Sequence, residues 1–403
     1  MDLNSIRVLV CPSGFKGSLQ PEQAAKCIQE GIHAVAPSAK IRQVPLVDGG
    51  EGFTRALVAA TGGQIYHATV TGPVGCPVNT FWGVLGTRSP TAPRTIVLEM
   101  AAAAGLSLVP ESQRDPGITT TYGVGELIKH ALNAGAQRIV VGCGDSGTCD
   151  GGAGMLQALG AVLLDDSGKP LPQAGGGNSI ASLARVDLGG LDDRLRTGLV
   201  TIEVAVNWTN VLCGEHGVAR VFGKQKGATE EQIEHLSRAM DKLAEAAGVI
   251  LDELDVGLAM GGGASGGLGT GLKLIGATLR PRYEVVAEYI DLRTLFDDCD
   301  LVITAEGGID DQTPRGKIPA EIAMRAKQFG LPVVAIAGTI GQGASVNYEA
   351  GIDAYTCILQ RPTTLEEAVA EAEKLTRECA ECVMRMISIG WMLTSRGRKH
   401  WPQ

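Results

Sequence analysis

Short apolar runs alternate with amphipathic helical patterns at both ends of the chain, and this alternation restricts the fold more than any other feature. Arg7 to Cys11 is an apolar run, a helical pattern covers about Gln20 to Val35, and Ile41 to Leu46 is the next run. The same order returns near the C-terminus, at Leu301 to Thr304 and at Val333 to Ala337. Strands that alternate with helices form parallel sheets, because each crossover connection has room for a helix. We therefore predict an α/β fold.

The middle of the chain has a different pattern of apolar runs and turns. Residues 66–97 contain glycine–proline and proline–valine turn pairs between apolar runs, a pattern typical of an antiparallel meander. A length of 403 residues suits two domains. We predict a Rossmann-like parallel-sheet domain formed by both chain ends, residues 1–65 plus 288–403, with a second α/β domain inserted at residues 66–287.

Charge and composition exclude several classes of partner. A formal net charge of -9 argues against a nucleic-acid groove, which needs a basic face. No apolar run approaches the roughly 20 residues that cross a bilayer, and the first residues lack the basic region of a signal peptide. The 10 cysteines are scattered without the spacing of a secreted protein, which fits a reducing compartment. We expect a cytoplasmic protein with no nucleic-acid and no membrane partner.

A glycine-rich loop is the strongest local motif. It follows the apolar run Arg138 to Val141 and leads into a short helical pattern from Gly152 to Ala158. Free N–H groups at a helix start attract anions, and the helix dipole adds partial positive charge. Ser146 and Thr148 offer hydroxyl donors to such an anion, and Asp150 could hold a metal ion or accept a proton.

The same glycines fit other interpretations. Gly142, Gly144 and Gly147 match the dinucleotide fingerprint G-x-G-x-x-G, with Asp165 after the following apolar run. On these residues alone, a kinase phosphate loop and a dinucleotide site are about equally supported, ahead of a turn without a ligand. Asp150 weighs against the dinucleotide, because its carboxylate would repel a pyrophosphate that lacks a metal ion.

A second glycine cluster spans residues 261–271. Successive N–H groups of such a segment can wrap triphosphate oxygens, although no G-x-x-x-x-G-K-[ST] sequence occurs in the chain. The competing interpretation is a hinge or a close packing of helices. The ligand interpretation, which we favour, makes Gly262, Gly263, Ser265 and Gly266 nucleotide-binding residues.

Acidic loops follow two of the apolar runs. Asp48 and Glu51 flank a glycine pair, and Glu306 and Asp310 repeat the arrangement later. Kinases need carboxylates that hold Mg²⁺ or accept a proton, and cations that neutralise the transferring phosphoryl group. A single charge of this kind is usually a solvated surface residue, but recurrence at strand ends favours a shared site. The candidate cations in glycine-flanked loops are Lys16, Lys224, Lys226, Arg315 and Lys317.

Taken together, these segments resemble the bacterial glycerate kinases that yield 2-phosphoglycerate, over nearly the whole chain. The matching segments, in family order, include Phe15-Lys16, Asp48-Gly49-Gly50-Glu51-Gly52, Thr71-Gly72-Pro73, Glu99-Met100-Ala101, Asp150 to Gly160, Gln225-Lys226-Gly227-Ala228 and Gly316-Lys317. The resemblance implies an active site in the cleft between the two domains, with ATP, Mg²⁺ and a small hydroxy-acid substrate, and it tells against the dinucleotide. A homodimer is the candidate assembly.

These residues and the resemblance together lead us to predict roles for the residues singled out above and for Asn207. The expected catalytic residues are Lys16, Asp48, Glu51 and Asp150, of which Asp48 and Asp150 are also the expected metal ligands. The expected nucleotide contacts are Ser146, Thr148, Lys226, Gly262, Gly263, Ser265, Gly266 and Lys317. The expected substrate contacts are Asn207, Glu306, Asp310 and Arg315.

Several loops depart from the family pattern. Ser13 and Gly17 stand where relatives usually carry carboxylates, Cys149 replaces an asparagine, Asn207 an aspartate and Gly308 an arginine. Asparagine lacks the charge that a metal ion or a proton needs, and glycine lacks the guanidinium fork suited to carboxylate or phosphate. Two hypotheses follow: a kinase retuned for a different hydroxy acid, or a binding or regulatory relative without turnover. The surviving charged residues favour retained catalysis.

Overall fold

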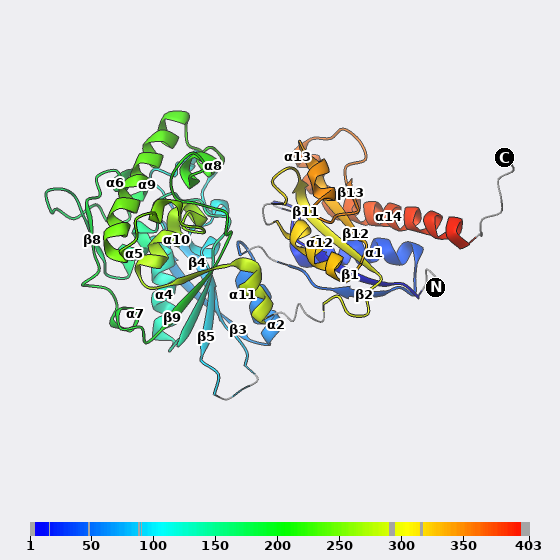
Figure 1. Ribbon diagram of the computed structural model, residues 1–403, viewed down its shortest axis with the longest axis horizontal. Coiled ribbons are helices and arrows are strands. Elements are labelled where there is room, and N and C mark those ends of the chain that lie inside the picture. The colour runs from blue at the N-terminus through cyan, green and yellow to red at the C-terminus, as the bar shows by residue number, and fades with distance from the viewer. Residues whose placement is uncertain are drawn as a thin grey trace. The chain divides into compact units, whose positions relative to one another are not determined.

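The protein divides into two compact units, which are Met1–Val47 with Asp291–Gln403 (unit 1) and Asp48–Ile290 (unit 2). A computed structural model describes residues 5–15, 17–46, 49–87, 89, 91–289, 295–314 and 317–395. Both units contain helices and strands, so the predicted α/β class is confirmed (Figure 1). Among the residues that the structure describes, no helix has both the length and the apolar character needed to cross a bilayer.

Within its described residues, unit 1 contains a five-stranded sheet whose neighbouring strands are all parallel. In sheet order the strands are β13 (Ala354–Cys357), β12 (Val333–Ile340), β11 (Leu301–Ile309), β1 (Arg7–Pro12) and β2 (Lys40–Gln43). The accompanying helices are α1 (Pro21–Val35), α12 (Ile318–Gln328), η6 (Ala344–Tyr348), α13 (Leu365–Ala370) and α14 (Ala372–Ser395). Both chain ends thus build one parallel sheet, as predicted.

Helices α1 and α14 pack against each other beside this sheet (Figure 1). Val10 of β1 and Ile32 of α1 are fully buried in the same apolar cluster. The helices meet at Gly31, where a Cβ atom would lie 2.4 Å from the carbonyl oxygen of Arg377. Any larger residue at this position would push the two helices apart.

Unit 2 contains, among its described residues, a six-stranded mixed sheet and a two-stranded ribbon. The large sheet has the order β10 (Thr278–Pro281), β9 (Thr201–Val206), β6 (Arg138–Gly142), β5 (Thr95–Glu99), β4 (Pro77–Val84) and β3 (Gln64–Thr71). The ribbon pairs β7 (Val162–Leu164) with β8 (Arg185–Asp187). Strands β3, β4 and β5 are antiparallel neighbours, which confirms the predicted meander, whereas β5, β6, β9 and β10 run parallel.

The helices of unit 2 lie on both faces of its large sheet (Figure 1). They are α2 (Phe53–Thr61), α3 (Ala101–Ala104), η2 (Leu106–Leu108), η3 (Glu111–Gln113), α4 (Tyr122–Asn133), α5 (Ala153–Ala158), α6 (Gly176–Ile180), α7 (Asp193–Arg196), α8 (Val218–Phe222), η4 (Lys224–Lys226), α9 (Glu230–Leu251), η5 (Val256–Leu258), α10 (Ala264–Leu274) and α11 (Arg282–Tyr289). Helices α2 and α11 cover one face. The opposite face forms the main apolar core with α4, α5, α9 and α10, and it includes Ile139, Leu127 and Leu268.

Three predicted boundaries need correction. Unit 2 begins at Asp48 rather than at residue 66, because α2 packs on the unit 2 sheet, where a Cβ on Gly83 would come within 2.3 Å of Val58. Strand β11 extends to Ile309 through its pairing with β12, so Glu306 lies in a strand and not in a loop. The helical pattern from Leu365 to Met392, which predicts one helix, forms two, since α13 ends at Ala370 and α14 begins at Ala372.

Candidate functional site

Two of the predicted motifs meet at the carboxyl edge of the unit 2 sheet. The glycine-rich loop follows the parallel strand β6 and therefore lies at the carboxyl edge of this sheet, which is where α/β proteins bind ligands. The loop Gly49–Gly52 packs directly onto the start of the glycine-rich loop that follows β6. A Cβ atom on Gly144 would lie 2.6 Å from the backbone nitrogen of Gly50, and one on Gly142 would lie 2.6 Å from the Gly49 carbonyl oxygen. Glycine is required on β6 for this close approach.

Lys226 anchors the glycine-rich loop from the inside. Its Nζ donates hydrogen bonds to Ser146 Oγ at 2.8 Å and to the Thr148 carbonyl oxygen at 2.7 Å. The residue is only 6% exposed, and burial lowers the pKa of its ammonium group, whereas Cys149 and Asp150 act in the opposite direction. The predicted nucleotide contacts Lys226, Ser146 and Thr148 are therefore neighbours. The Lys226 ammonium group, however, already donates hydrogen bonds to the glycine-rich loop.

Asp150 is buried beneath the same loop, where it organises the start of α5. Its Oδ2 accepts hydrogen bonds from Thr121 N at 2.8 Å, Thr121 Oγ1 at 2.9 Å and Gly154 N at 3.2 Å, and its Oδ1 accepts one from Gly152 N at 3.1 Å. Burial raises the pKa of Asp150, and these hydrogen bonds oppose the rise. A carboxylate that is 1% exposed and accepts four protein hydrogen bonds is better suited to positioning than to binding a metal ion.

The second glycine cluster packs against the first loop. The Gly266 carbonyl oxygen accepts a hydrogen bond from Gly151 N at 2.9 Å, and a Cβ atom on Gly266 would lie 2.0 Å from the Thr148 carbonyl oxygen. Gly262, Gly263, Ser265 and Gly266 are all buried. The arrangement favours the close-packing interpretation over a loop wrapped around a triphosphate, because these glycines already contact protein backbone.

The dinucleotide interpretation does not fit the structure. Asp165 lies in the turn after β7, where its Oδ1 accepts hydrogen bonds from the backbone nitrogens of Ser167 and Lys169, both at 2.9 Å. Strand β7 pairs with β8 in a separate ribbon and is not a neighbour of β6 in the large sheet. The fingerprint requires a βαβ unit with both strands in one sheet, and this segment does not form one.

Glu51 is the exposed carboxylate of this edge. Its backbone nitrogen donates to Asp145 Oδ2 at 3.2 Å, and its side-chain Oε1 accepts a hydrogen bond from the Ser107 hydroxyl group. The described contacts of Glu51 thus come from two segments that follow parallel strands, Ser107 after β5 and Asp145 after β6. Asn207, at the end of β9, is half-buried, and its Oδ1 accepts hydrogen bonds from Thr209 N at 3.3 Å and Thr209 Oγ1 at 3.0 Å.

Glu99 is a residue of this edge to which sequence reasoning assigns no role. It ends β5 and is 2% exposed, and it accepts hydrogen bonds from Gly52 N at 3.1 Å and Thr54 N at 2.7 Å. Burial raises the pKa of Glu99 to about 7 against the effect of these hydrogen bonds. The sequence signal that could have found Glu99 is an acidic residue directly after the apolar run Ile96 to Leu98.

The remaining predicted residues belong to unit 1 or lie outside the described residues. Lys317 Nζ pairs with Asp310, at 3.0 Å from Oδ1 and 3.1 Å from Oδ2, and donates to the Gly308 carbonyl oxygen at 3.2 Å. Burial alone would raise the pKa of Asp310, but Lys317 and neighbouring donors hold it below its usual value. Glu306 is half-buried within β11. The predicted residues outside the described part of the chain are Lys16, Asp48 and Arg315.

The Asp310–Lys317 pair leads to a stability prediction. We expect Asp310→Asn to lower the free energy of unfolding by about 0.5 kcal/mol at neutral pH, because both side chains are partly solvated and screened. The folded-state pKa of Asp310 is lowered, so its contribution is present at neutral pH and is lost as the pH falls through the folded-state value. Urea unfolding at about pH 7 and about pH 3 would measure this, with Glu349→Gln as an exposed control.

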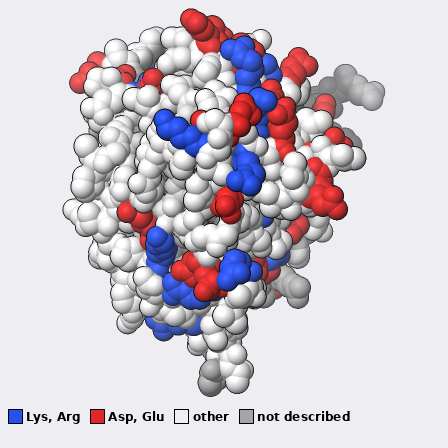
Figure 2. All heavy atoms as spheres, turned by 90° about the vertical axis from the view of Figure 1, so that its left-hand side faces the viewer, with Lys and Arg blue, Asp and Glu red and all other residues white. Residues whose placement is uncertain are grey.

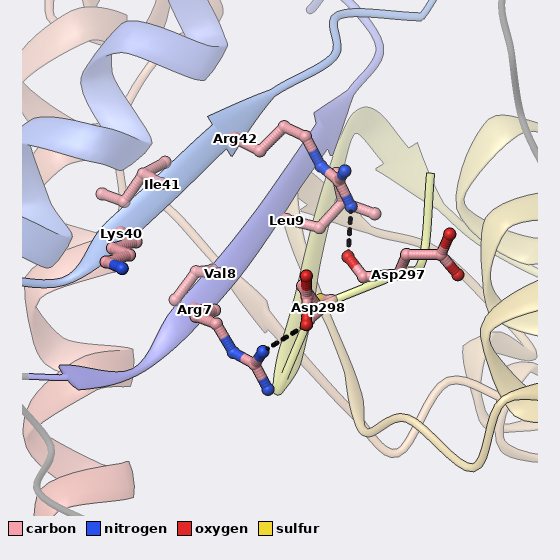
Figure 3. A pocket seen from close by; sticks show the side chains of 9 residues that line it. Arg7, Val8, Leu9, Lys40, Ile41, Arg42, Asp297 and Asp298 are labelled. Carbon is pink, nitrogen blue, oxygen red and sulfur yellow. Dashed lines mark hydrogen bonds and ion pairs between the residues drawn. The ribbon is translucent and has the colours of Figure 1, made fainter. Parts of the chain in front are cut away.

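One pocket of unit 1 is not a candidate site. It has a volume of about 340 Å³ and lies at the amino ends of β1 and β2 (Figure 3). Arg7 already pairs there with Asp298 at 2.8 Å, and Arg42 donates to the Asp297 carbonyl oxygen at 2.9 Å. Parallel sheets bind ligands at the opposite, carboxyl edge, so the pocket is better explained by packing.

Acidic and basic side chains are interspersed on the surface shown in Figure 2. In unit 2, Arg220 pairs with Glu234 at 2.7 Å and Arg194 with Asp192 at 2.7 Å. Across the described residues, no group of three or more His, Cys, Asp or Glu side chains is arranged to hold a metal ion.

Comparison with known proteins places the chain in a family. The sequence profile of the Glycerate kinase family matches residues 8–388. The chain is 43% identical over 385 residues to a glycerate kinase of Bacillus subtilis (strain 168), covering 95% of this chain and 98% of that protein. It is 41% identical over 386 residues to a glycerate 2-kinase of Escherichia coli (strain K12), covering 96% and 99%. A solved structure from Salmonella typhimurium LT2, assigned as a glycerate kinase 2, matches with a TM-score of 0.74 and 42% identity over 96% of this chain and 100% of that one. The chain belongs to the glycerate kinase family.

Proposed function

We propose that this protein is an ATP-dependent kinase that phosphorylates glycerate at the 2-hydroxyl group and yields 2-phosphoglycerate. The observation that carries the proposal is similarity to glycerate kinases, one of them a glycerate 2-kinase, over nearly the whole chain. The convergence of the Glu51 loop and the glycine-rich loop at one carboxyl edge supports it, because this edge is the usual ligand site of an α/β sheet.

The chain supplies mainly positioning and charge to such a reaction. ATP would provide the phosphoryl group, and Mg²⁺ would supply positive charge that neutralises it. Mg²⁺ usually keeps several waters and takes few protein ligands, so the lack of a carboxylate cage among the described residues is compatible with its use. Glu51 is the described carboxylate that we propose as the group that orients or deprotonates the attacking hydroxyl. Asp48, outside the described residues, remains a proposed metal ligand.

The remaining predicted ligand contacts are also proposals. Asn207 offers an amide to the hydroxy acid at the end of β9, and Glu306 and Asp310 are proposed substrate contacts from unit 1. Lys317 would face phosphate oxygens only if it left Asp310, to which it is bonded at 3.0 Å. A phosphate and the Asp310 carboxylate would then compete for the Lys317 ammonium group. Phosphate binding would therefore depend on the charge of Asp310.

A coupled assay tests the proposed reaction. Purified protein with ATP, Mg²⁺ and D-glycerate is expected to release ADP with a kcat of about 1–100 s⁻¹. Enolase added without a phosphoglycerate mutase should convert the product directly, since enolase takes 2-phosphoglycerate and not the 3-phosphate isomer. No ADP release with any hydroxy acid of three to five carbons would defeat the proposal. A product that needs the mutase would overturn the assignment to the 2-hydroxyl group.

A kinase of a different small hydroxy acid is the second candidate, and the loop substitutions favour considering it. We expect Asn207→Asp to fold normally, with an unfolding midpoint within about 2 °C of the parent, because a carboxylate can accept the same hydrogen bonds from Thr209. If Asn207 contacts the acid, the variant should shift the ratio of kcat/KM between glycerate and larger hydroxy acids by about 10-fold. An unchanged ratio would place Asn207 outside the substrate site. A binding relative without turnover would show thermal stabilisation by ligand and no ADP.

A further inference from the structure

We propose that Glu99 is a positioning residue, which fixes the loop Gly49–Gly52 and thereby holds the exposed carboxylate of Glu51 in place for the reaction. This inference rests on the proposed function and adds to it the element that orients one of its groups. Glu99 has no part in substrate binding as described above, because it is buried at the end of β5.

The contacts of Glu99 span the junction between the loop and α2. Oε1 accepts a hydrogen bond from Gly52 N, and Oε2 accepts one from Thr54 N. Gly52 is the N-cap of α2, with a left-handed φ of 92°, and no side chain of its own caps the helix. The Glu99 carboxylate, which comes from β5, therefore takes the place of the missing side-chain cap of α2. Both oxygens are used, one for each donor.

The position of Glu51 depends on this junction. The neighbouring anchors are the Glu51 N hydrogen bond to Asp145 Oδ2 at 3.2 Å and the Phe53 N hydrogen bond to the Gly50 carbonyl oxygen at 3.2 Å. Both are long, whereas Thr54 N lies 2.7 Å from Glu99. Loss of the Glu99 contacts would leave the Glu51 segment held by these two long hydrogen bonds and by the Ser107 hydroxyl group, which donates to Glu51 Oε1. A displacement of about 1 Å at a reacting group can cost about 100-fold in rate.

The charge state of Glu99 decides whether it can hold both donors. An ionised carboxylate accepts with both oxygens, whereas a protonated acid or an amide presents a donor on one of the two atoms. Burial raises the pKa of Glu99 to about 7, with a smaller contribution from the nearby Glu51 and against the hydrogen bonds from Thr54 and Gly52. The loop is therefore expected to be fully held above about pH 7 and loosened below it.

The other elements around Glu99 bring little charge to it. The neighbour of Glu99 on β6 is Gly142, α3 consists of alanines, and β4 has no titratable residue. On α2 the titratable residue is Arg55, which lies over the Phe81 ring. Helix α4 carries Tyr122, Lys129 and His130 besides Glu126, which accepts from Thr71 N at 2.6 Å. Asp145 is engaged by the Glu51 backbone nitrogen.

The experiment compares Glu99→Gln with Glu126→Gln in the full-length protein. Glu126 is the matched control, because it is a partly buried carboxylate that also accepts a backbone N–H from another element, away from the loop. We expect wild-type kcat with glycerate to fall on the acidic side of about pH 7. Glu99→Gln should have a kcat about 10- to 100-fold lower at about pH 8, with this acidic limb lost. Glu126→Gln should keep the wild-type profile.

A second measurement separates positioning from loss of stability. The folded-state pKa of Glu99 is raised, so its ionisation costs stability as the pH rises from about 4.5 to about 7. The stability of Glu99→Gln relative to wild type should therefore improve over this range, opposite in sign to its activity deficit. Hydrogen exchange of the Gly52 and Thr54 amides should be at least about 10-fold faster in Glu99→Gln at about pH 8.

The outcomes distinguish this inference from the proposed function. A wild-type protein without turnover would overturn the proposed function, and with it the catalytic consequence of Glu99. An active wild type together with a Glu99→Gln variant of unchanged kcat and pH profile would overturn this inference alone. Unchanged exchange at Gly52 and Thr54 would overturn the positioning role whatever the activity.

Discussion

Replacing Lys226 with methionine is expected to lower kcat with glycerate by at least about 100-fold in a protein that still folds. The Lys226 ammonium group joins Ser146 Oγ to the Thr148 carbonyl oxygen within the glycine-rich loop. Methionine has a similar length and is apolar, so it fills the buried space but donates no hydrogen bond. The glycine-rich loop would then lose the two hydrogen bonds that connect Ser146 to Thr148 through Lys226, and its backbone would lose its fixed conformation.

The stability of this variant should change less than its activity. Leaving two buried oxygens without this donor costs roughly 1–3 kcal/mol for a neutral group, while the removal of a buried charge offsets part of that cost. Lys224→Met is the matched control, because Lys224 lies in the same η4 segment with a side chain that is 83% exposed. Steady-state kinetics and urea unfolding of both variants measure the two effects. Wild-type kcat in Lys226→Met would show that these hydrogen bonds of Lys226 have no part in the reaction.

The substitution Gly266→Ala is expected to destabilise unit 2 by about 3 kcal/mol or more. Gly266 has a φ of +71°, and its added Cβ would lie 2.0 Å from the Thr148 carbonyl oxygen. The left-handed conformation alone costs alanine roughly 1–2 kcal/mol. The clash adds more, because both partners are backbone atoms and neither can rotate away.

A matched glycine separates the two contributions. Gly135 has a φ of +80° and nothing within 4 Å of an added Cβ, so Gly135→Ala should show the conformational cost without the clash, about 1 kcal/mol. Urea denaturation followed by circular dichroism would give both free energies of unfolding. Equal losses in the two variants would contradict the close packing of the second glycine cluster against the first loop.

Local patterns in the sequence predict the secondary structure around the candidate site well. The apolar run from Arg138, the glycine-rich segment and the short helical pattern correspond to β6, its loop and α5. The antiparallel meander and the parallel sheet of both chain ends are likewise present. These features are predictable because backbone preferences and hydrophobic periodicity depend on residues close in the chain.

Several predictions about function depend on contacts between residues that are far apart in the chain, and no local sequence pattern shows such contacts. Lys226 and Ser146 are 80 positions apart, and Asp150 and Thr121 are 29 apart. The sequence shows a lysine and an aspartate in small-residue loops, which are equally suited to a ligand and to the protein's own backbone. The first domain boundary was also predicted too late, because α2 could pack on either sheet until the contacts of its buried face were known.

The amino-acid order alone therefore establishes the succession of strands, loops and helices, the α/β class and the resemblance to glycerate kinases. The tertiary structure decides which polar side chains are buried, because a buried charge is tolerated only where hydrogen-bond partners from remote segments surround it. Asp150, Lys226 and Glu99 find such partners and become part of the framework of the carboxyl edge. Glu51 stays exposed on that framework.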